Sequence, residues 1–191
     1  MLKLSSPNNF LTDREVGCIE TLINDNNLHA AIRQCIKTLK NPQAKKWEKS
    51  FMVRFLLHYV GDIHQPLHCI QLYSPQFPHG DLVGHRFLIQ GTPYNNLHLL
   101  WDAAFGIGDQ KMIRPLSLED EKWICMTADS IEKMFPINSM SESKNMDYLQ
   151  WSKESYLIAT QIIYHNVQHQ GVPSTEYLDI SLYVRLLLLD V

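Results

Sequence analysis

The chain has 191 residues, of which 45% are hydrophobic and 19% are charged, and its formal net charge at pH 7 is −3. This length suits one ordinary domain with a sizeable core, and the composition excludes an intrinsically disordered chain. A protein that holds nucleic acid through Lys and Arg alone carries more positive charge than this. Nucleic-acid chemistry in this chain would therefore need positive charge from another source, such as bound metal.

The hydrophobic periodicity is helical along most of the chain, without an internal repeat. Breaking or capping residues separate the helical segments, namely the run Asn24-Asp25-Asn26-Asn27, the pair Asn41-Pro42, Pro66, and the pair Asn95-Asn96. The predicted helices are Val16–Ile23, Leu28–Leu39, Trp47–His64, Leu97–Phe105, one marked by Ile124, Ala128, Ile131 and Phe135, then Trp151–Val167 and Tyr177–Val191. The last helix stops without a capping residue, and both ends of the sequence look cut.

Residues 73–96 interrupt the helical pattern. The proline and glycine residues of this segment predict a long irregular loop: Pro75, Pro78, Gly80, Gly84, Gly91 and Pro93. The segment Arg86-Phe87-Leu88-Ile89 within this loop is compatible with a short strand. The predicted fold class is all-α, a mainly helical domain over residues 1–191 with one long irregular loop.

The sequence contains no segment that assigns the chain to a compartment. Its first letters, MLKLSSP, are too few and too polar for the apolar core of a signal peptide. No apolar run approaches the roughly 20 residues that a membrane-spanning helix needs. The four cysteines are scattered without a CxxC spacing, at Cys18, Cys35, Cys69 and Cys125. Buried free thiols and disulfides both remain open interpretations of this pattern.

Two His-x-x-x-Asp pairs stand out on predicted helices. In the first helix, Phe51, Phe55, His58 and Asp62 fall within a narrow arc, because offsets of 4, 7 and 11 residues return to one face. We therefore expect His58 and Asp62 to point into the interior with the two phenylalanines. In the second, His98, Asp102 and Phe105 share a face in the same way.

Each pair places an imidazole and a carboxylate one helical turn apart, with roughly 6 Å between Cβ atoms. Such side chains can converge on one zinc ion, whose ligand distances are about 2.0–2.2 Å. A buried, hydrogen-bonded His–Asp pair is the simpler interpretation of either pair alone. Two pairs together with His68, which follows the bend at Pro66, favour metal binding. Imidazole and carboxylate donors without a thiolate cluster suit a hydrolytic zinc site better than a structural one.

The segments that carry these residues resemble a known family. The strings FLLHYVGDIHQPLH, GDLVGHRFLI and NNLHLLWD resemble the zinc-dependent, single-strand-preferring nucleases of the S-one/P-one family. The resemblance extends to CIETLI at 18–23 and to WSKESYLIATQIIY at 151–164, so it covers most of the chain. It implies a mostly helical fold shared with the zinc-dependent phospholipases C.

The resemblance also implies roles for particular residues. His58 and Asp62 match ligands of one zinc, and Asp62 matches the carboxylate that bridges to a neighbouring ion and thereby takes part in catalysis. His68, His98 and Asp102 match the complete protein ligand set of a second zinc. His64 matches no ligand of the family, and we interpret it as a histidine at the helix end or beside the ligands. Trp101 is expected in the core.

The sequence departs from the family pattern in two places. The family's site holds up to three zinc ions, and its remaining ligands lie upstream; none of them has a match before Cys18. We therefore expect a chain shortened at its N-terminus, and also at its C-terminus, which is less active than a longer version. The family's Gly-Gly-Asn loop appears here as Val83-Gly84-His85. His85 or His79 is a candidate substitute ligand, although an exposed loop histidine is the simpler interpretation.

The resemblance implies an endonuclease or phosphodiesterase that binds at least one zinc and hydrolyses single-stranded DNA and RNA to 5′-phosphorylated products. A 3′-nucleotidase activity belongs to the same expectation. A phospholipase C-like phosphodiesterase and a non-catalytic, zinc-binding helical protein are the alternatives. The expected partner is single-stranded nucleic acid or a nucleotide, and no protein partner is inferred. Secretion or a vesicular location is expected from the family alone.

Overall fold

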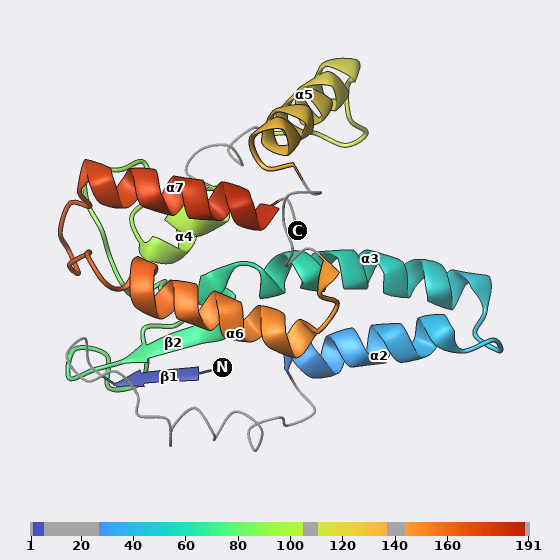
Figure 1. Cartoon of the computed structure of the whole chain (residues 1–191), viewed down its shortest axis with the longest axis horizontal. Helices are drawn as coiled ribbons and strands as arrows, with labels where there is room; N and C mark the ends of the chain where they lie inside the picture. The colour runs from blue at the N-terminus through green and yellow to red at the C-terminus, as the bar shows by residue number, and fades with distance from the viewer. Residues whose placement is uncertain (1, 6–26, 105–110, 137–143, 190–191) are drawn as a thin grey trace. The chain divides into compact units, whose positions relative to one another are not determined.

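The computed structural model describes residues 2–5, 27–104, 111–136 and 144–189 (Figure 1). Four predictions concern residues outside these ranges: the helix at 16–23, the role of Cys18, the end of the 97–105 helix at Phe105, and the end of the last helix at Val191. The chain divides into two compact units, one of Met1–Arg86 with Tyr148–His165 and one of Phe87–Asp147 with Asn166–Val191. A single domain over residues 1–191 stays a prediction. Every helix in the described ranges is too short or too polar to cross a lipid bilayer.

The first unit begins with two consecutive helices, α2 (Leu28–Lys40) and α3 (Lys46–Ile63), which pack against each other. The side chain of Asn27 starts α2 by accepting a hydrogen bond of 2.9 Å from the amide of Ala30. A carboxylate oxygen of Glu48 accepts one of 2.6 Å from the amide of Lys45 at the start of α3. Both predicted helices are confirmed, and α3 ends before Pro66 as expected.

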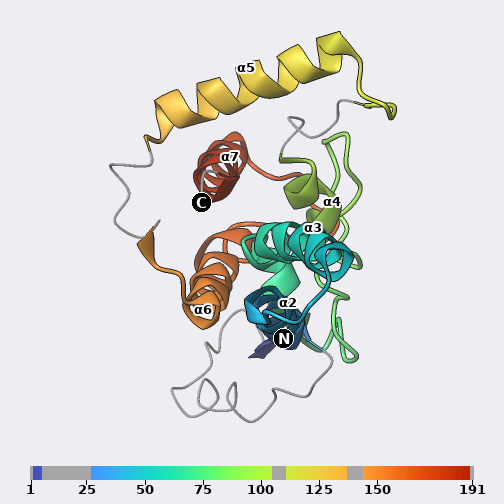
Figure 2. The ribbon, with the colours of Figure 1, turned by 90° about the vertical axis from the view of Figure 1, so that its right-hand side faces the viewer.

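A third long helix completes this unit. Helix α6 (Tyr148–Ile158) continues into η6 (Ala159–Ile163), a π-helical segment, and packs against α3 and the short 3-10 helix η2 (Pro66–Cys69). Figure 2 shows α2 and α3 nearly end-on, with α6 beside them. The core is formed by Ile32, Ile63, Cys69 and Trp151, with Leu28, Ile36, Leu56, Tyr59, Val60 and Tyr148 around them.

Two short strands in the first unit were not predicted. Strand β2 (Ile70–Tyr73) pairs in parallel with β1 (Leu2–Ser5), in a register that sets Leu2 against Ile70 and Ser5 against Tyr73. Strands of four residues carry too little alternation to be distinguished from a loop in the sequence. The fold is nevertheless mainly helical, as predicted.

The second unit contains α4 (Leu97–Asp102), α5 (Leu118–Met134) and α7 (Thr175–Leu189). Asn96 starts α4 by accepting a hydrogen bond of 2.9 Å from the amide of Leu99. The irregular course predicted after residue 73 is confirmed for 74–96. The strand considered at 86–89 is reduced to an isolated bridge between Leu88 and Asn96.

Candidate metal centre

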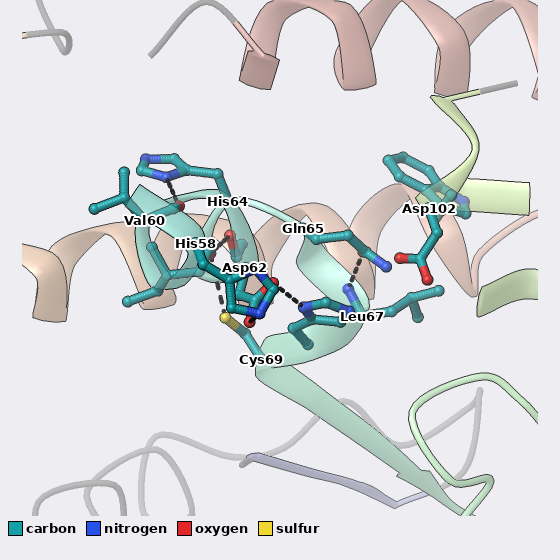
Figure 3. A network of polar contacts seen from close by, with 12 residues as sticks. His58, Val60, Asp62, His64, Gln65, Leu67, Cys69 and Asp102 are labelled. Atoms are coloured by element: carbon teal, nitrogen blue, oxygen red, sulfur yellow. Dashed lines mark hydrogen bonds and ion pairs between the residues drawn. The ribbon is translucent and has the colours of Figure 1, made fainter. Parts of the chain in front are cut away.

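In the first unit, Asp62 lies between two histidines, and each of its carboxylate oxygens faces a different one (Figure 3). Nε2 of His58 lies 3.3 Å from Oδ2 of Asp62, one turn apart on α3. Nδ1 of His68, which comes from η2, lies 3.5 Å from Oδ1. The helical spacing accounts for the first contact. The second depends on the bend between α3 and η2.

That bend is built from backbone and side-chain hydrogen bonds. The amide of Gln65 donates to the carbonyl of Asp62 over 3.1 Å, and the Gln65 side chain accepts from the amide of Leu67 over 2.8 Å. Pro66 begins η2, a position at which its missing N–H costs nothing. These contacts turn the chain directly after Asp62 and bring His68 back toward it.

The end of α3 is also tied to other parts of the first unit. The carbonyl of Ile63 accepts hydrogen bonds from the Ser155 hydroxyl, at 2.6 Å, and from the Cys69 thiol, at 3.4 Å. Burial raises the pKa of Cys69 to about 12, so the thiol keeps the proton that it donates. Both donors are buried. The backbone between Asp62 and His68 is therefore fixed from two sides.

The predicted interior position of His58 is wrong. The side chain of His58 is 67% exposed, and Phe51 is 49% exposed. Helix α3 carries a second apolar stripe, with Leu56, Tyr59, Val60 and Ile63, roughly a third of a turn around the helix, and the core forms on that stripe instead. Phe51, Arg54, Phe55 and His58 line an open pocket of about 210 Å³.

The second unit carries the other predicted pair, on α4. Nε2 of His98 lies 3.0 Å from Oδ2 of Asp102. The His98 side chain is 8% exposed, whereas that of Asp102 is 42% exposed. Between them in sequence, Trp101 is fully buried, which confirms its expected place in the core. The pair thus combines a buried imidazole with a carboxylate open to solvent.

Other predicted residues have simpler positions. His64 caps the C-terminus of α3, its Nδ1 lies 2.7 Å from the carbonyl of Val60, and its ring lies 4.9 Å from that of Trp151. The helix-end interpretation of His64 is confirmed. His79 and His85 are exposed in the irregular segment, and a role for either as a ligand stays a prediction. Cys35 and Cys69 are buried free thiols, and Cys125 is an exposed one.

Sequence reasoning missed three residues that contact these helices from far away in the chain: Ser155, which bonds Ile63 of α3, and Tyr177 and Arg185, which bond Trp101 of α4. Each acts on a residue far away in the sequence, so helical periodicity carries no sign of the contact. One signal was available. Tyr177 and Arg185 are polar residues at an interval of eight in a strongly apolar helix, and such an interval places them on one face.

The donors of both pairs are imidazole nitrogen and carboxylate oxygen, without a thiolate among them. This chemistry fits a divalent ion such as zinc in a site that keeps room for substrate. Contacts of 3.0–3.5 Å between donors are also those of hydrogen-bonded pairs, but His58 is 67% exposed and Asp102 is 42% exposed, so neither pair is buried as the simpler interpretation expected.

Imidazole and carboxylate donors in sites open to solvent are typical of metal-dependent hydrolases. The model of the S1/P1 nuclease family matches residues 7–185, nearly the whole chain, and the protein belongs to this family. Membership makes it a nuclease or phosphodiesterase, that is, a hydrolase acting on nucleic acid, from a metal-dependent family. No curated protein matches the chain significantly.

Proposed function

We propose that the protein is a zinc-dependent nuclease that hydrolyses single-stranded DNA and RNA to 5′-phosphorylated products. The observation that carries this proposal is the position of Asp62, whose two carboxylate oxygens face two different histidines at 3.3 and 3.5 Å. A carboxylate arranged in this way is suited to serve two cations at once. Family membership supplies the reaction class, and the donor chemistry supports zinc.

The proposal assigns ligands to two ions. His58 and Asp62 would hold one zinc, with Asp62 bridging to a neighbouring ion, while His68, His98 and Asp102 would be the complete protein ligand set of a second zinc. This assignment requires that the pair on α4 share an ion with His68, and that association is part of the proposal. Bound zinc would supply Lewis acidity and lower the pKa of a coordinated water toward about 7. It would also supply the positive charge that a chain of net charge −3 lacks.

The chain's own residues have separable tasks. Asp62 and Asp102 provide the negative charge that attracts cations, and both carboxylates are partly accessible, which leaves a path for an ion to enter. Each histidine would offer a ring nitrogen as a metal ligand. The short contacts to Asp62 and Asp102 orient the imidazole rings before metal arrives.

The proposal is tested by incubating the zinc-supplied protein with four substrates: single-stranded DNA, single-stranded RNA, a 3′-mononucleotide and phosphatidylcholine. We expect cleavage of the nucleic acids to 5′-phosphorylated products, at a rate that falls at least about 100-fold in His98→Ala. His165→Ala, which removes an exposed histidine, is the matched control and should leave the rate unchanged. Release of phosphate from the 3′-mononucleotide tests the expected 3′-nucleotidase activity.

Three outcomes would overturn the proposal or its ligand assignment. Cleavage of phosphatidylcholine without cleavage of nucleic acid would favour the phospholipase C-like alternative. Zinc binding without hydrolysis of any of the four substrates would favour a non-catalytic helical protein. Equal rates in His98→Ala and His165→Ala would show that the pair on α4 has no part in the reaction.

A further inference from the structure

Helix α7 carries a stripe of buried polar side chains in an otherwise apolar sequence. Tyr177, Ser181 and Arg185 follow one another at intervals of four, so they lie on one face of the helix. Tyr177 is 4% exposed, Ser181 0% and Arg185 8%. Buried polar groups are costly unless they are bonded, and a buried guanidinium most of all. This stripe therefore needs a structural or functional reason.

Two residues of the stripe contact the same tryptophan on α4. Nε of Arg185 donates a hydrogen bond of 3.1 Å to the carbonyl of Trp101, and the Tyr177 hydroxyl accepts one of 3.4 Å from the indole Nε1. Trp101 is thus held at its backbone and at the far end of its side chain. It immediately precedes Asp102 and lies three residues after His98.

Helix α4 needs such support because it has only six residues. A helix this short is marginal by itself, and the carbonyls of its last turn lack partners within the helix. The Trp101 carbonyl accepts from the amide of Ala103 at the end of the helix and also from Nε of Arg185. Arg185 therefore adds a bond from α7 to the end of α4.

Arg185 also faces a charge. Burial lowers the pKa of its guanidinium, and the carboxylate of Asp102 acts in the opposite direction, toward keeping the guanidinium charged. The contact that the side chain makes near Asp102 is its hydrogen bond to the Trp101 carbonyl, directly before Asp102 in the chain. Tyr177 bonds the side chain of Trp101, whereas Arg185 bonds its backbone. The two clamps on Trp101 differ in this respect.

We infer that Arg185 is a positioning residue for the metal-binding pair His98–Asp102. It acts through the Trp101 carbonyl, and it holds the pair in the 3.0 Å arrangement that presents both donors to one ion. The inference rests on the proposed function in so far as this pair binds metal. Groups that orient metal ligands in this way typically change metal affinity by about 10–100-fold when removed.

The test replaces zinc by cobalt, whose visible absorption spectrum reports the geometry of its ligands. We compare Arg185→Gln, Arg185→Lys, Tyr177→Phe, and Arg114→Gln as an exposed arginine control in the same unit. Arg185→Gln should bind cobalt about 10–100-fold more weakly and give an altered spectrum. Arg185→Lys keeps the charge and should recover part of the affinity. Tyr177→Phe should lower the thermal midpoint with a smaller change in affinity.

Hydrogen exchange of the α4 amides in metal-free protein separates this inference from the proposed function. If wild-type protein takes up no cobalt, the proposed function fails, and exchange over α4 still decides the role of Arg185. Faster exchange in Arg185→Gln than in Arg114→Gln supports the clamp. Unchanged exchange, or unchanged cobalt affinity and spectrum in a metal-binding protein, overturns the inference. If Arg185→Gln does not fold, Arg185→Lys is compared with wild type instead. Faster α4 exchange in Arg185→Lys then supports the inference, and unchanged exchange, cobalt affinity and spectrum overturn it.

Discussion

The hydroxyl of Ser155 donates a hydrogen bond of 2.6 Å to the carbonyl oxygen of Ile63, a residue 92 positions earlier in the chain. Ile63 is the last residue of α3 and directly follows Asp62, so its carbonyl has no partner within the helix. Both residues are buried. The bond therefore connects α6 to the point at which the backbone turns from Asp62 toward His68.

Removing this hydroxyl should destabilise the protein. Ser155→Ala leaves the Ile63 carbonyl with the weaker thiol donor of Cys69, and we expect the free energy of unfolding to fall by about 1–2 kcal/mol. Urea denaturation monitored by circular dichroism measures the change. Ser130→Ala is the matched control, because Ser130 is exposed and its hydroxyl bonds to the carbonyl of Met126 within α5. Equal losses in the two variants would contradict a special role for Ser155.

A second buried pair, Asp81 and Tyr164, predicts a pH-dependent effect. The Tyr164 hydroxyl donates a hydrogen bond of 2.5 Å to Oδ2 of Asp81, and the amide of Leu72 donates to Oδ1 over 3.0 Å. Burial raises the pKa of Asp81 above its ordinary value of 3.8, and these hydrogen bonds act in the opposite direction. The pKa of Asp81 is higher in the folded state than in the unfolded state. The free energy of unfolding therefore falls as the pH rises from 3.8 through the folded-state pKa.

Tyr164→Phe should therefore be more destabilising at about pH 7.5 than at about pH 4. Without the hydroxyl, the ionised carboxylate loses a donor and its pKa rises further, so the folded state loses about 1–3 kcal/mol once Asp81 is ionised. Near pH 4 the protonated carboxyl has less need of that donor. Urea denaturation at both pH values measures the difference. Tyr183→Phe replaces an exposed tyrosine, so its loss of stability should be nearly the same at the two pH values. An equally pH-independent loss in Tyr164→Phe would contradict a role of the Tyr164 hydroxyl in stabilising ionised Asp81.

The local features of the fold and site could be predicted from the sequence. Asn27 and Asn96 cap their helices as their side-chain chemistry predicts, because a cap depends on residues two or three positions away. The contacts of His58 with Asp62 and of His98 with Asp102 follow from helical spacing. Both depend on interactions within one turn of helix.

Features that depend on distant residues could not be predicted. Helix α3 has two apolar stripes, and its own sequence does not say which one α2 and α6 will cover; the stripe containing His58 was the wrong choice. The contacts of Ser155 with Ile63 and of Arg185 with Trp101 join residues 92 and 84 positions apart. A single sequence carries no periodic signal for such contacts.

The assignment of Asp62 as a ligand of two ions predicts a contrast with its neighbour His64. Asp62→Asn removes the charge that would serve both ions, so zinc per protein should fall in this variant. His64→Asn removes a buried imidazole that bonds the carbonyl of Val60, and it should reduce stability with little change in zinc content. Elemental analysis of the two purified, metal-replete proteins checks this. An equal or larger loss of zinc in His64→Asn would mean that the ligands are wrongly assigned.

The central claim of the proposed function is that imidazole and carboxylate groups of this chain, His98 among them, bind zinc. The most direct measurement is the zinc content of the purified chain after zinc loading and removal of free metal, compared with His98→Ala and the control His165→Ala. The account predicts at least one zinc per chain in wild type and His165→Ala, and a clear loss in His98→Ala. A zinc content indistinguishable from zero in wild type, or an equal content in all three proteins, would contradict it.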